Sequence, residues 1–399
     1  MKILVCNVGS TSLKFKLYEM PGKQVLAWCG IERVGSADDA LFHYKNLQSG
    51  YSEDLSGLNI PDYETGIRMY LDYLSGENTG VIRRIEEIER VGYKATLSKG
   101  HFGIHELDDE VLQGMEDWIA LAPLHNRAYL SAIRVMRDFL PEALFVGCFE
   151  TAFHQSIPME RKIFGVPYEW YQQYGVQRLG YHGASHGYIA DVLNERSREE
   201  KGSGSYAAIS CHLGGSCSIC AIDSGKSVDT SFGMSLESGL IHANRIGDMD
   251  PSMVYFLKSE GMSDEQILEG LQKKGGLLGI SGVSNDLRYV IEATEEGNER
   301  ARLAVDVFVT GIVHYIGAFY LDLGRLDYLV FTAGIGEHSD YLRKKVCDKL
   351  KAIGICLDEE KNAAADGICE ISTADSAARV LVIPTDEELG IARRTYEYQ

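Results

Sequence analysis

Three glycine-containing turns are candidates for phosphate binding, because each directly follows a run of residues that predicts a β-strand. The turns are Asn-Val-Gly-Ser-Thr-Ser at 7–12, His-Leu-Gly-Gly-Ser at 212–216 and Ala-Gly-Ile-Gly-Glu at 333–337. Glycine lets backbone N–H groups approach a phosphate closely, and serine hydroxyls add further donors. None matches the Walker pattern or the dinucleotide fingerprint, and each turn alone could be purely structural. Three of them in one chain favour a nucleotide held between two lobes.

Two of these turns lie at the same place in a repeated pattern of three short strands. We expect the strands at 2–8, 13–18 and 25–30, and again at 206–213, 217–222 and 227–230. The two turns also share the letters G-S-x-S, at 9–12 and 215–218. The repeat predicts two lobes of one design, although two similar glycine hairpins can also arise by chance.

Strands and helices alternate through the rest of the chain. Helices are expected at 110–122 and 126–140, and strands at 143–149, 328–332 and 379–383. The last helix should begin at Thr385, with a capping box completed by Glu388. This alternation predicts α/β lobes with central sheets, and a length of 399 residues fits two large domains.

The charge of the chain limits its partners. It contains 58 acidic and 39 basic residues, which gives a net charge of −19. A surface this negative repels nucleic acids and anionic membranes, so we expect neither as a partner. An anionic ligand must instead be bound by a few local cations or backbone N–H groups.

The apolar segments and cysteines indicate a cytoplasmic protein. We expect no signal peptide, and the most apolar long segment, 304–320, contains Asp306 and His314 and predicts a buried helix. The nine cysteines are an odd number and are scattered, which favours reduced thiols. The pair Cys217 and Cys220 has redox spacing, but its apolar surroundings favour simple packing.

A series of stretches along the whole chain resembles the acetokinase family of short-chain carboxylate kinases. In family order they are 7–14, 122–126, 151–155, 180–186, 212–214, 225–231, 245–251, 331–337 and 384–389. The resemblance implies two similar lobes of the duplicated ribonuclease H-like fold shared with sugar kinases and actin, with a nucleotide cleft between them. It implies an N-terminal lobe of 1–150 plus 386–399, and a C-terminal nucleotide-binding lobe of 151–385.

The reaction that the resemblance implies is reversible transfer of the γ-phosphoryl group of ATP to a carboxylate such as acetate, giving ADP and an acyl phosphate. Mg²⁺ and a homodimer are implied in the same way. A carboxylate is already ionised at pH 7, so the reaction needs no general base. It needs cations that align two anions and neutralise charge on the transferred group.

The resemblance also assigns site residues by matching position. Arg245 would bind carboxylate and phosphoryl oxygens, His182 would donate to the phosphoryl group, and Asn7 and Glu387 would lie near Mg²⁺. The nucleotide would be bound by Ser10, Ser12, Lys14, His212, Gly214, Gly215, Gly334, Gly336 and His338. The acid would be bound by Lys94, Thr96, Leu124, Tyr181 and Leu236. By residue type alone, a packing, ion-pair or helix-cap role also stays open for these histidines, cations and carboxylates, but the sequence context favours the functional roles.

Several positions depart from the family pattern. Lys94 stands where the family has a catalytic arginine, and Glu150 stands where it has an aspartate. Lysine lacks the bidentate fork of arginine, and glutamate reaches one methylene further than aspartate, so the two changes could compensate one another or mark decay. Loss of the arginine fork at Lys94 leaves open a nucleotide-binding paralogue with impaired catalysis. A kinase with another donor such as pyrophosphate also stays open, because Gly215 and Ser216 replace the family's Asn-Gly and His338 replaces an asparagine in the phosphate and adenosine turns. The hydroxyls of Thr96 and Tyr181 also allow an acid more polar than acetate.

Overall fold

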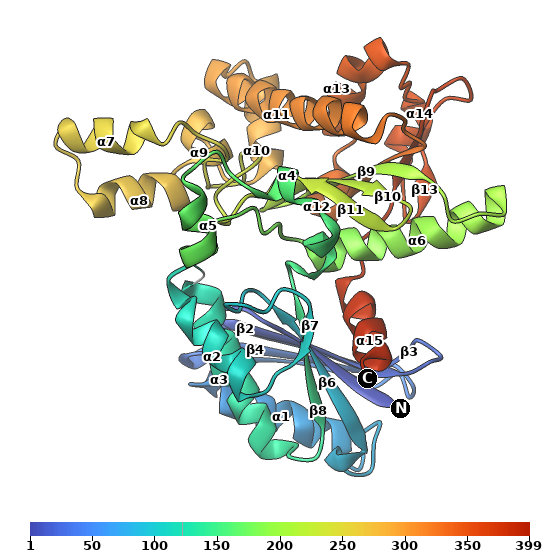
Figure 1. Cartoon of the computed structure of the whole chain (residues 1–399). Coiled ribbons are helices and arrows are strands. Elements are labelled where there is room, and N and C mark those ends of the chain that lie inside the picture. The colour runs from blue at the N-terminus through green and yellow to red at the C-terminus, as the bar shows by residue number, and fades with distance from the viewer. Residues whose placement is uncertain (122) are drawn as a thin grey trace. The chain divides into compact units, whose positions relative to one another are not determined.

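The chain divides into two units in a computed structural model, which describes residues 1–121 and 123–399 (Figure 1). Unit 1 comprises Met1–Gln155 and Asp386–Gln399, and unit 2 comprises Ser156–Thr385. The side chains of Pro123, Leu124 and Lys201 lie outside the described part.

Unit 1 is built on a mixed sheet with the spatial order β5-β4-β3-β2-β1-β6-β8-β7. Its strands are β1 (Lys2–Val8), β2 (Ser12–Glu19), β3 (Gln24–Glu32), β4 (Ser36–Asn46), β5 (Ser52–Ile60), β6 (Ile88–Ala95), β7 (Ile104–Glu106) and β8 (Leu144–Phe149). β1, β6 and β8 run parallel to one another, whereas the other neighbours are antiparallel. The carboxyl ends of the three parallel strands therefore lie along one edge of the sheet.

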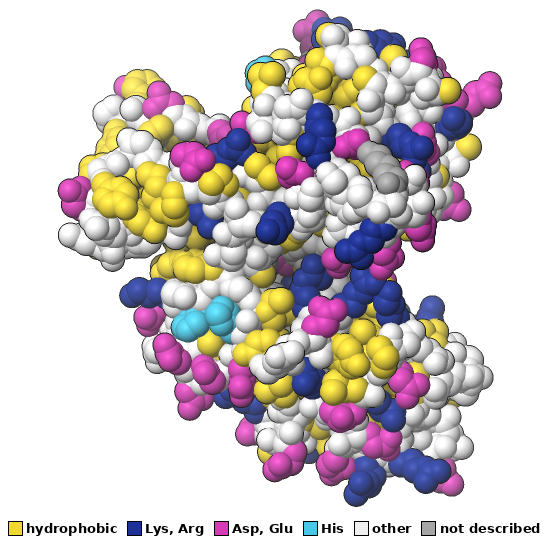
Figure 2. Space-filling model, turned by 45° about the vertical axis from the view of Figure 1, so that its right-hand side comes forward, with side chains coloured by type: hydrophobic (Ala, Val, Ile, Leu, Met, Phe, Trp, Pro, Cys, Tyr) yellow, Lys and Arg dark blue, Asp and Glu magenta, His cyan; other side chains and the backbone are white. Residues whose placement is uncertain are grey.

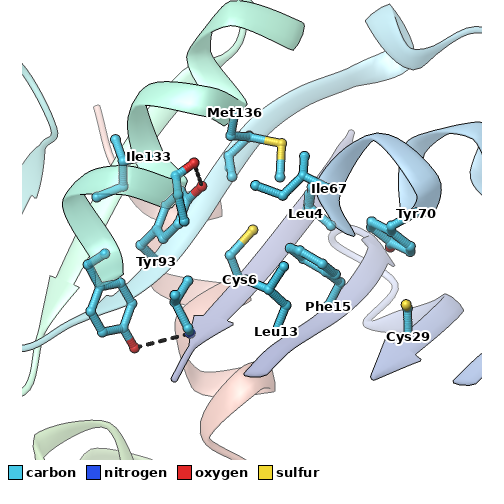
Figure 3. Packing of buried hydrophobic residues seen from close by; sticks show 14 of the residues in the cluster. Leu4, Cys6, Leu13, Phe15, Cys29, Ile67, Tyr70, Tyr93, Ile133 and Met136 are labelled. Carbon is cyan, nitrogen blue, oxygen red and sulfur yellow. Dashed lines mark hydrogen bonds between the residues drawn. The ribbon is translucent and has the colours of Figure 1, made fainter. Parts of the chain in front are cut away.

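Helices cover both faces of this sheet. They are α1 (Tyr63–Ser75), η1 (Ile85–Glu87), α2 (Asp109–Asp117), η2 (Ile119–Leu121), α3 (Pro123–Phe139), η3 (Ala152–Ser156) and α15 (Glu387–Glu397). Because side chains alternate along a strand, Leu4 and Cys6 of β1 pack with α1 and α3 (Figure 3), while Ile3 and Val5 pack with α15. Both faces of β1 are therefore buried.

The C-terminal helix α15 lies very close to β6. A Cβ atom on Gly92 of β6 would overlap Thr395 Oγ1 and would lie 2.9 Å from Ile391 Cγ2. Arg90 donates to the carbonyls of Thr395 at 2.7 Å and Tyr398 at 2.6 Å, near the end of the helix. Glycine and arginine on one strand thus fix the position of α15, whose first residue is the predicted site residue Glu387.

Unit 2 repeats the strand arrangement of unit 1. Its sheet has the order β11-β10-β9-β12-β14-β13. The strands are β9 (Ala207–Leu213), β10 (Cys217–Asp223), β11 (Lys226–Thr230), β12 (Tyr328–Thr332), β13 (Cys369–Glu370) and β14 (Arg379–Val382). In both units an antiparallel meander is followed by two strands parallel to its first, with three strands in the meander of unit 2 and five in that of unit 1. The predicted duplication is confirmed.

Helices surround the sheet of unit 2, and the longest packs into its core. They are α4 (Met159–Lys162), α5 (Tyr168–Tyr174), α6 (Gly183–Lys201), α7 (Ser252–Ser259), α8 (Asp264–Gln272), α9 (Gly276–Ser281), α10 (Leu287–Glu295), α11 (Glu299–Leu323), α12 (Ala333–His338), α13 (Asp340–Leu350), η4 (Lys351–Ile353) and α14 (Glu359–Ala363). Among the described residues, α11 is the one helix long and apolar enough to cross a membrane. Its residues Ala304, Phe308, Ile312 and Ile316 are fully buried in the core, as expected for 304–320.

Two local predictions need correction. The helix expected at 110–122 ends at Asp117 and gives way to the short turn η2, and residue 122 lies outside the described part. The predicted capping box at Thr385 is wrong. Asp386 is the cap, because its Oδ1 accepts from Leu389 N at 3.1 Å, while Thr385 N donates to Glu337 Oε1 at 3.2 Å.

The close approach of α15 to β6 predicts the effect of one added methyl group. Gly92→Ala should lower stability by about 1–3 kcal/mol, the usual cost of overpacking a filled core. Adding Thr395→Ala should restore part of this loss, because it removes the overlapping oxygen. Urea unfolding of both variants measures the effect.

The matched control is Gly317→Ala on α11, where a Cβ meets no atom within 4 Å. This control should be neutral or slightly stabilising, since alanine is the better helix former. An unchanged midpoint for Gly92→Ala would contradict the packing of α15 on β6.

Candidate active site

In unit 1, the ammonium group of Lys94 lies between two carboxylates. Its Nζ is 2.6 Å from Glu387 Oε2 and 3.4 Å from Glu150 Oε1. β6 carries Lys94 near its carboxyl end, Glu150 directly follows the neighbouring parallel strand β8, and Glu387 begins α15. The three residues are thus brought together by strand order and by the docked C-terminal helix.

The electrostatics of this group favour a charged lysine. Burial lowers the pKa of Lys94, but Glu150 and Glu387 together raise it by more, so the pKa lies well above its ordinary value. An ammonium has three N–H donors; one donates to Glu387 Oε2 at 2.6 Å, and the contact with Glu150 is an ion pair at 3.4 Å, so donor capacity is left for a further oxygen.

The first glycine turn lies at the carboxyl end of β1. Asn7 Oδ1 accepts from the Tyr129 hydroxyl at 3.3 Å, and Tyr63 donates to the carbonyls of Gly9 at 2.8 Å and Ser10 at 3.0 Å. Tyr63 therefore occupies carbonyl oxygens of the turn. Of the other predicted residues, Ser10 is exposed and Ser12 begins β2.

A second lysine, Lys16, also lies near the start of α15 and was not predicted from the sequence as a site residue. Lys16 Nζ lies 3.7 Å from Asp386 Oδ1 and 3.6 Å from Glu388 Oε2, on either side of Glu387 in the sequence. Lys14 and Lys16 alternate with the buried residues Leu13, Phe15 and Leu17 along β2. This alternation was a usable signal that both lysines are on the face of the sheet opposite to α1.

In unit 2, His182 lies in a cluster of aromatic rings at the start of α6. Its backbone is in the left-handed region (φ 58°, ψ 28°), which is unfavourable for a residue with a Cβ and is found most often at functional sites. The ring stacks on that of His212, with 3.9 Å between the centroids, and meets the edge of Phe232 at 5.1 Å. The ring plane of His182 is thus defined by its neighbours.

Buried serine hydroxyls connect the histidines of this cluster. Ser218 Oγ is 2.8 Å from both His182 Nδ1 and His186 Nε2, and Ser210 Oγ is 3.0 Å from His186 Nδ1. The Ser185 hydroxyl is 2.8 Å from His212 Nδ1. Ser210 and His212 lie two apart on β9, and Ser218 pairs with His212 across the sheet, so these side chains share the face next to α6.

Arg245 is held beside the predicted acid-binding residues of unit 2. Its guanidinium donates to the carbonyl of Leu236 at 2.7 Å, and the buried Tyr181 hydroxyl donates to the carbonyl of Met234 at 2.5 Å. Tyr181 also meets the ring of Phe232 at 5.2 Å. Tyr181 and Arg245 therefore fix the same short segment, 234–236, and the hydroxyl hydrogen of Tyr181 is already used.

A cavity of about 850 Å³ in unit 2 is lined by several of the predicted nucleotide-binding residues. Gly214, Gly215, Gly334 and His338 line it, together with 285–288 before and within α10. A Cβ on Gly215 or Gly334 would meet no atom within 4 Å, so both glycines leave open space. Sequence analysis missed the contribution of 285–288.

Other predicted residues lie elsewhere in the described structure. His212 belongs to the histidine cluster, and Gly336 is buried in α12 with its Cβ position 3.3 Å from the carbonyl carbon of Phe331. Thr96 is buried directly after β6 in unit 1, and Lys14 is exposed on β2. The side chain of Leu124 lies outside the described part.

The chain matches known proteins over its whole length. Residues 2–393 match the model of the acetokinase family. The chain is 41% identical over 400 residues to the acetate kinase of Halothermothrix orenii, covering 99% of this chain and 98% of that protein. It is 40% identical over 397 residues to the acetate kinase of Treponema denticola, covering 99% of both.

Two solved structures share the fold at similar coverage. The acetate kinase of Porphyromonas gingivalis superposes with a TM-score of 0.87 at 37% identity, covering 99% of this chain and 98% of that one. The propionate kinase of Francisella tularensis superposes with a TM-score of 0.88 at 32% identity, covering 99% of both chains.

His242 lies in the loop that carries Arg245, and its protonation should make the folding stability of the protein depend on pH. It is fully buried, Cys217 N donates to its Nδ1 at 2.9 Å, and its Nε2 donates to the Ser238 carbonyl at 3.3 Å. Burial, assisted by the Arg245 charge, lowers the pKa of His242 from 6.5 to about 3. Between these values the unfolded chain binds a proton that the folded chain does not, so stability falls as the pH falls below 6.5.

From pH 7 to pH 5 this single group should remove about 2 kcal/mol of folding free energy. Asparagine does not titrate in that window. In His242→Asn the loss of folding free energy from pH 7 to pH 5 should therefore be about 2 kcal/mol smaller than in wild type. Urea unfolding of both proteins at the two pH values measures the difference. Equal pH dependence would contradict a neutral, buried His242.

Proposed function

Because the chain belongs to the acetokinase family, we propose that it transfers the γ-phosphoryl group of ATP to acetate or a similar short-chain acid. The chain is an enzyme, an ATP-dependent carboxylate kinase. The observation that carries this conclusion is the match over residues 2–393, with acetate kinases about 40% identical from end to end. The residue roles, the metal, the preferred acid and the assembly are our proposals.

Arg245 is proposed to bind the carboxylate and phosphoryl oxygens. A guanidinium has five N–H donors, and the bond to the Leu236 carbonyl uses only part of them while fixing the side chain. No proton must be removed from an ionised carboxylate, so a fixed cation suits this reaction better than a general base. Alignment of two anions in this way is a large share of catalysis in phosphoryl transfer.

His182 is proposed to donate a hydrogen bond to the transferred phosphoryl group. The stacked rings and the serine hydroxyls around it hold the imidazole in one orientation. A donor that is already oriented costs no reorganisation as negative charge shifts in the transition state. Its ring is therefore suited to stabilise charge rather than to exchange protons.

The nucleotide is proposed to bind in the cavity of unit 2. The cavity volume lies within the range of roughly 300–1,000 Å³ that is usual for ligand pockets. Gly215 and Gly334 leave open space for a close approach of the ligand to the backbone, and His338 adds a side-chain donor. Gly214 also lines the cavity, although its N–H donates to the Ser216 carbonyl at 3.2 Å. His212, Gly336, Ser10, Ser12 and Lys14 stay in the proposal as phosphate-side residues by their match to the family alone.

Mg²⁺ is proposed to be held by Asn7 and Glu387 in unit 1. Mg²⁺ prefers oxygen ligands and usually keeps several waters, using one or two protein groups beside the phosphates. The amide oxygen of Asn7 and the carboxylate of Glu387 fit that donor set. Among the described residues no group of three or more His, Cys, Asp or Glu forms a metal cage, which suits such a partly hydrated ion. When bound, the ion would neutralise phosphate charge.

Lys94, held by Glu150, is proposed to bind an oxygen of the acid or phosphoryl group with its remaining N–H donor. Thr96, Leu124, Tyr181 and Leu236 are proposed to surround the acid. Because Tyr181 donates its hydrogen to the Met234 carbonyl, its hydroxyl can meet a hydroxylated substrate only as an acceptor. We favour an unsubstituted acid, acetate or propionate, because the similar proteins are named acetate and propionate kinases.

We also propose a cytoplasmic homodimer. All nine cysteines are free thiols in the described structure, and seven are buried, which fits a reducing compartment. Figure 2 shows hydrophobic side chains gathered over the part of unit 2 that carries α7 and α8, where Tyr255 and Phe256 are exposed. Exposed apolar residues of this kind are typical of protein interfaces.

The proposal is tested by acyl hydroxamate formation with acetate, propionate, butyrate and lactate, using Mg-ATP or pyrophosphate as donor. We expect product with ATP, and acetate or propionate with the highest kcat/KM. The control is His182→Ala, which should lose about 10²–10³ in kcat, as expected when one preorganised donor is removed.

The other outcomes identify the alternatives. Binding of ATP without product from any acid would indicate an impaired paralogue. Product with pyrophosphate but not with ATP would indicate a changed donor. A preference for lactate would contradict our proposal that the preferred acid is unsubstituted.

A further inference from the structure

The hydroxyl of Ser218 lies between two imidazole rings and has a single hydrogen to share. Its Oγ is 2.8 Å from His182 Nδ1 and 2.8 Å from His186 Nε2. Ser218 is fully buried in β10, and so is His186 in α6. The hydroxyl can therefore donate to one ring and accept from the other, which makes the protonation of the two rings interdependent.

Ser210, at the far end of this chain of hydrogen bonds, determines the direction in which the hydrogens are donated. Ser210 is fully buried in β9, and within residues 1–121 and 123–399 the structure gives its hydroxyl one partner, His186 Nδ1 at 3.0 Å. If Nδ1 carried a hydrogen and donated it, the hydrogen of Ser210 would be left buried without an acceptor, which is costly. Ser210 therefore donates to His186 Nδ1.

The remaining hydrogens follow from that first bond. With its Nδ1 accepting, His186 carries its hydrogen on Nε2 and donates to Ser218 Oγ. Ser218 then donates its own hydrogen to His182 Nδ1. A neutral His182 that accepts at Nδ1 must carry its hydrogen at Nε2. A protonated Nδ1 on His182 would instead place two donors against Ser218 and leave the serine hydrogen unbonded.

We propose that Ser210, His186 and Ser218 are positioning residues that fix His182 as the Nε2–H tautomer. This inference rests on the proposed role of His182 as a hydrogen-bond donor to the phosphoryl group. The serine–histidine–serine chain selects which nitrogen carries the hydrogen, while His212 and Phe232 select the plane of the ring. Both selections are needed, because a correctly placed ring with the wrong tautomer presents a lone pair to the phosphoryl oxygen.

The first test reads the tautomer directly in the free protein. ¹⁵N-histidine-labelled wild type is compared with His182→Asn, whose missing signals assign the His182 ring. We expect the ¹⁵N shift of a protonated nitrogen at Nε2 and of an unprotonated nitrogen at Nδ1. In Ser218→Ala the two shifts should move toward each other, as expected for a mixture of tautomers.

The second test separates positioning from stability. Ser218→Ala and Ser210→Ala should lower kcat by roughly 10- to 100-fold, the usual effect of losing a partner that orients a functional histidine, with little change in either KM. The matched control is Ser197→Ala. This serine is also fully buried and donates to the Ser203 carbonyl at 2.9 Å, but it contacts none of the rings, so kcat should stay as in wild type.

A double variant tests whether the effect passes through His182. In the His182→Ala background, adding Ser218→Ala should change kcat by less than about 2-fold, because coupled residues are not additive. A further loss equal to that in wild type would overturn the proposal.

The spectroscopic test separates this inference from the proposed function. Absence of kinase activity with an Nε2–H tautomer would refute the function and leave the tautomer assignment supported. A wild-type His182 protonated at Nδ1 would overturn the inference whether or not the protein is active. The Ser210→Ala variant gives the same reading if Ser218→Ala does not fold.

Discussion

A lysine ammonium between two carboxylates is the interaction on which unit 1 depends. Lys94, Glu150 and Glu387 come from β6, from the residue after β8 and from the start of α15, and Lys94 and Glu387 are 293 residues apart in the sequence. Partly buried charges are stable only when they are paired. Removing Lys94 would leave two carboxylates facing each other, and displacing α15 would remove one of them. The close approach of Gly92 to α15 and the bonds from Arg90 therefore serve the site as well as the fold.

In unit 2, too, charged and polar side chains must be held by partners, but there the partners are mostly neutral groups. An enzyme with a net charge of −19 must still gather a carboxylate and a polyphosphate. In unit 2 one cation, Arg245, is fixed by the Leu236 carbonyl, and the surrounding rings are arranged by hydrogen bonds to buried serines. His242 supports this loop as a neutral ring with both nitrogens engaged. Oriented donors can stabilise the phosphoryl charge without the cost of burying further cations.

Sequence patterns predicted the meanders of both units to within two residues, because short alternating strands and glycine turns are local signals. They missed β4 and β5, whose acidic residues 38–39 and 53–54 hide the alternation of a half-exposed hairpin. The return of α15 to the N-terminal lobe followed from the family resemblance alone, since its position depends on contacts across nearly the whole chain, which local sequence patterns do not report. Residue matches to the family put Lys94, His182 and Arg245 forward as site residues, and these assignments stay predictions. The hydrogen bonds of Ser210 and Ser218 to the histidines were not predicted, because a serine within a strand gives no sequence pattern that indicates its partner. The two-residue spacing of Ser210 and His212 did place both on one face of β9.

We propose that Lys94 and Glu150 have adjusted to each other, and a double-mutant cycle tests this most directly. The measurement is kcat/KM with acetate for wild type, Lys94→Arg, Glu150→Asp and the double variant. We expect each single change to lower activity, because the larger guanidinium crowds Glu387 and the shorter aspartate draws away from Nζ. The double variant should lie well above the value expected from the two singles, with a coupling of about 1 kcal/mol or more. Additive effects, or a gain in activity from Lys94→Arg alone, would contradict the account.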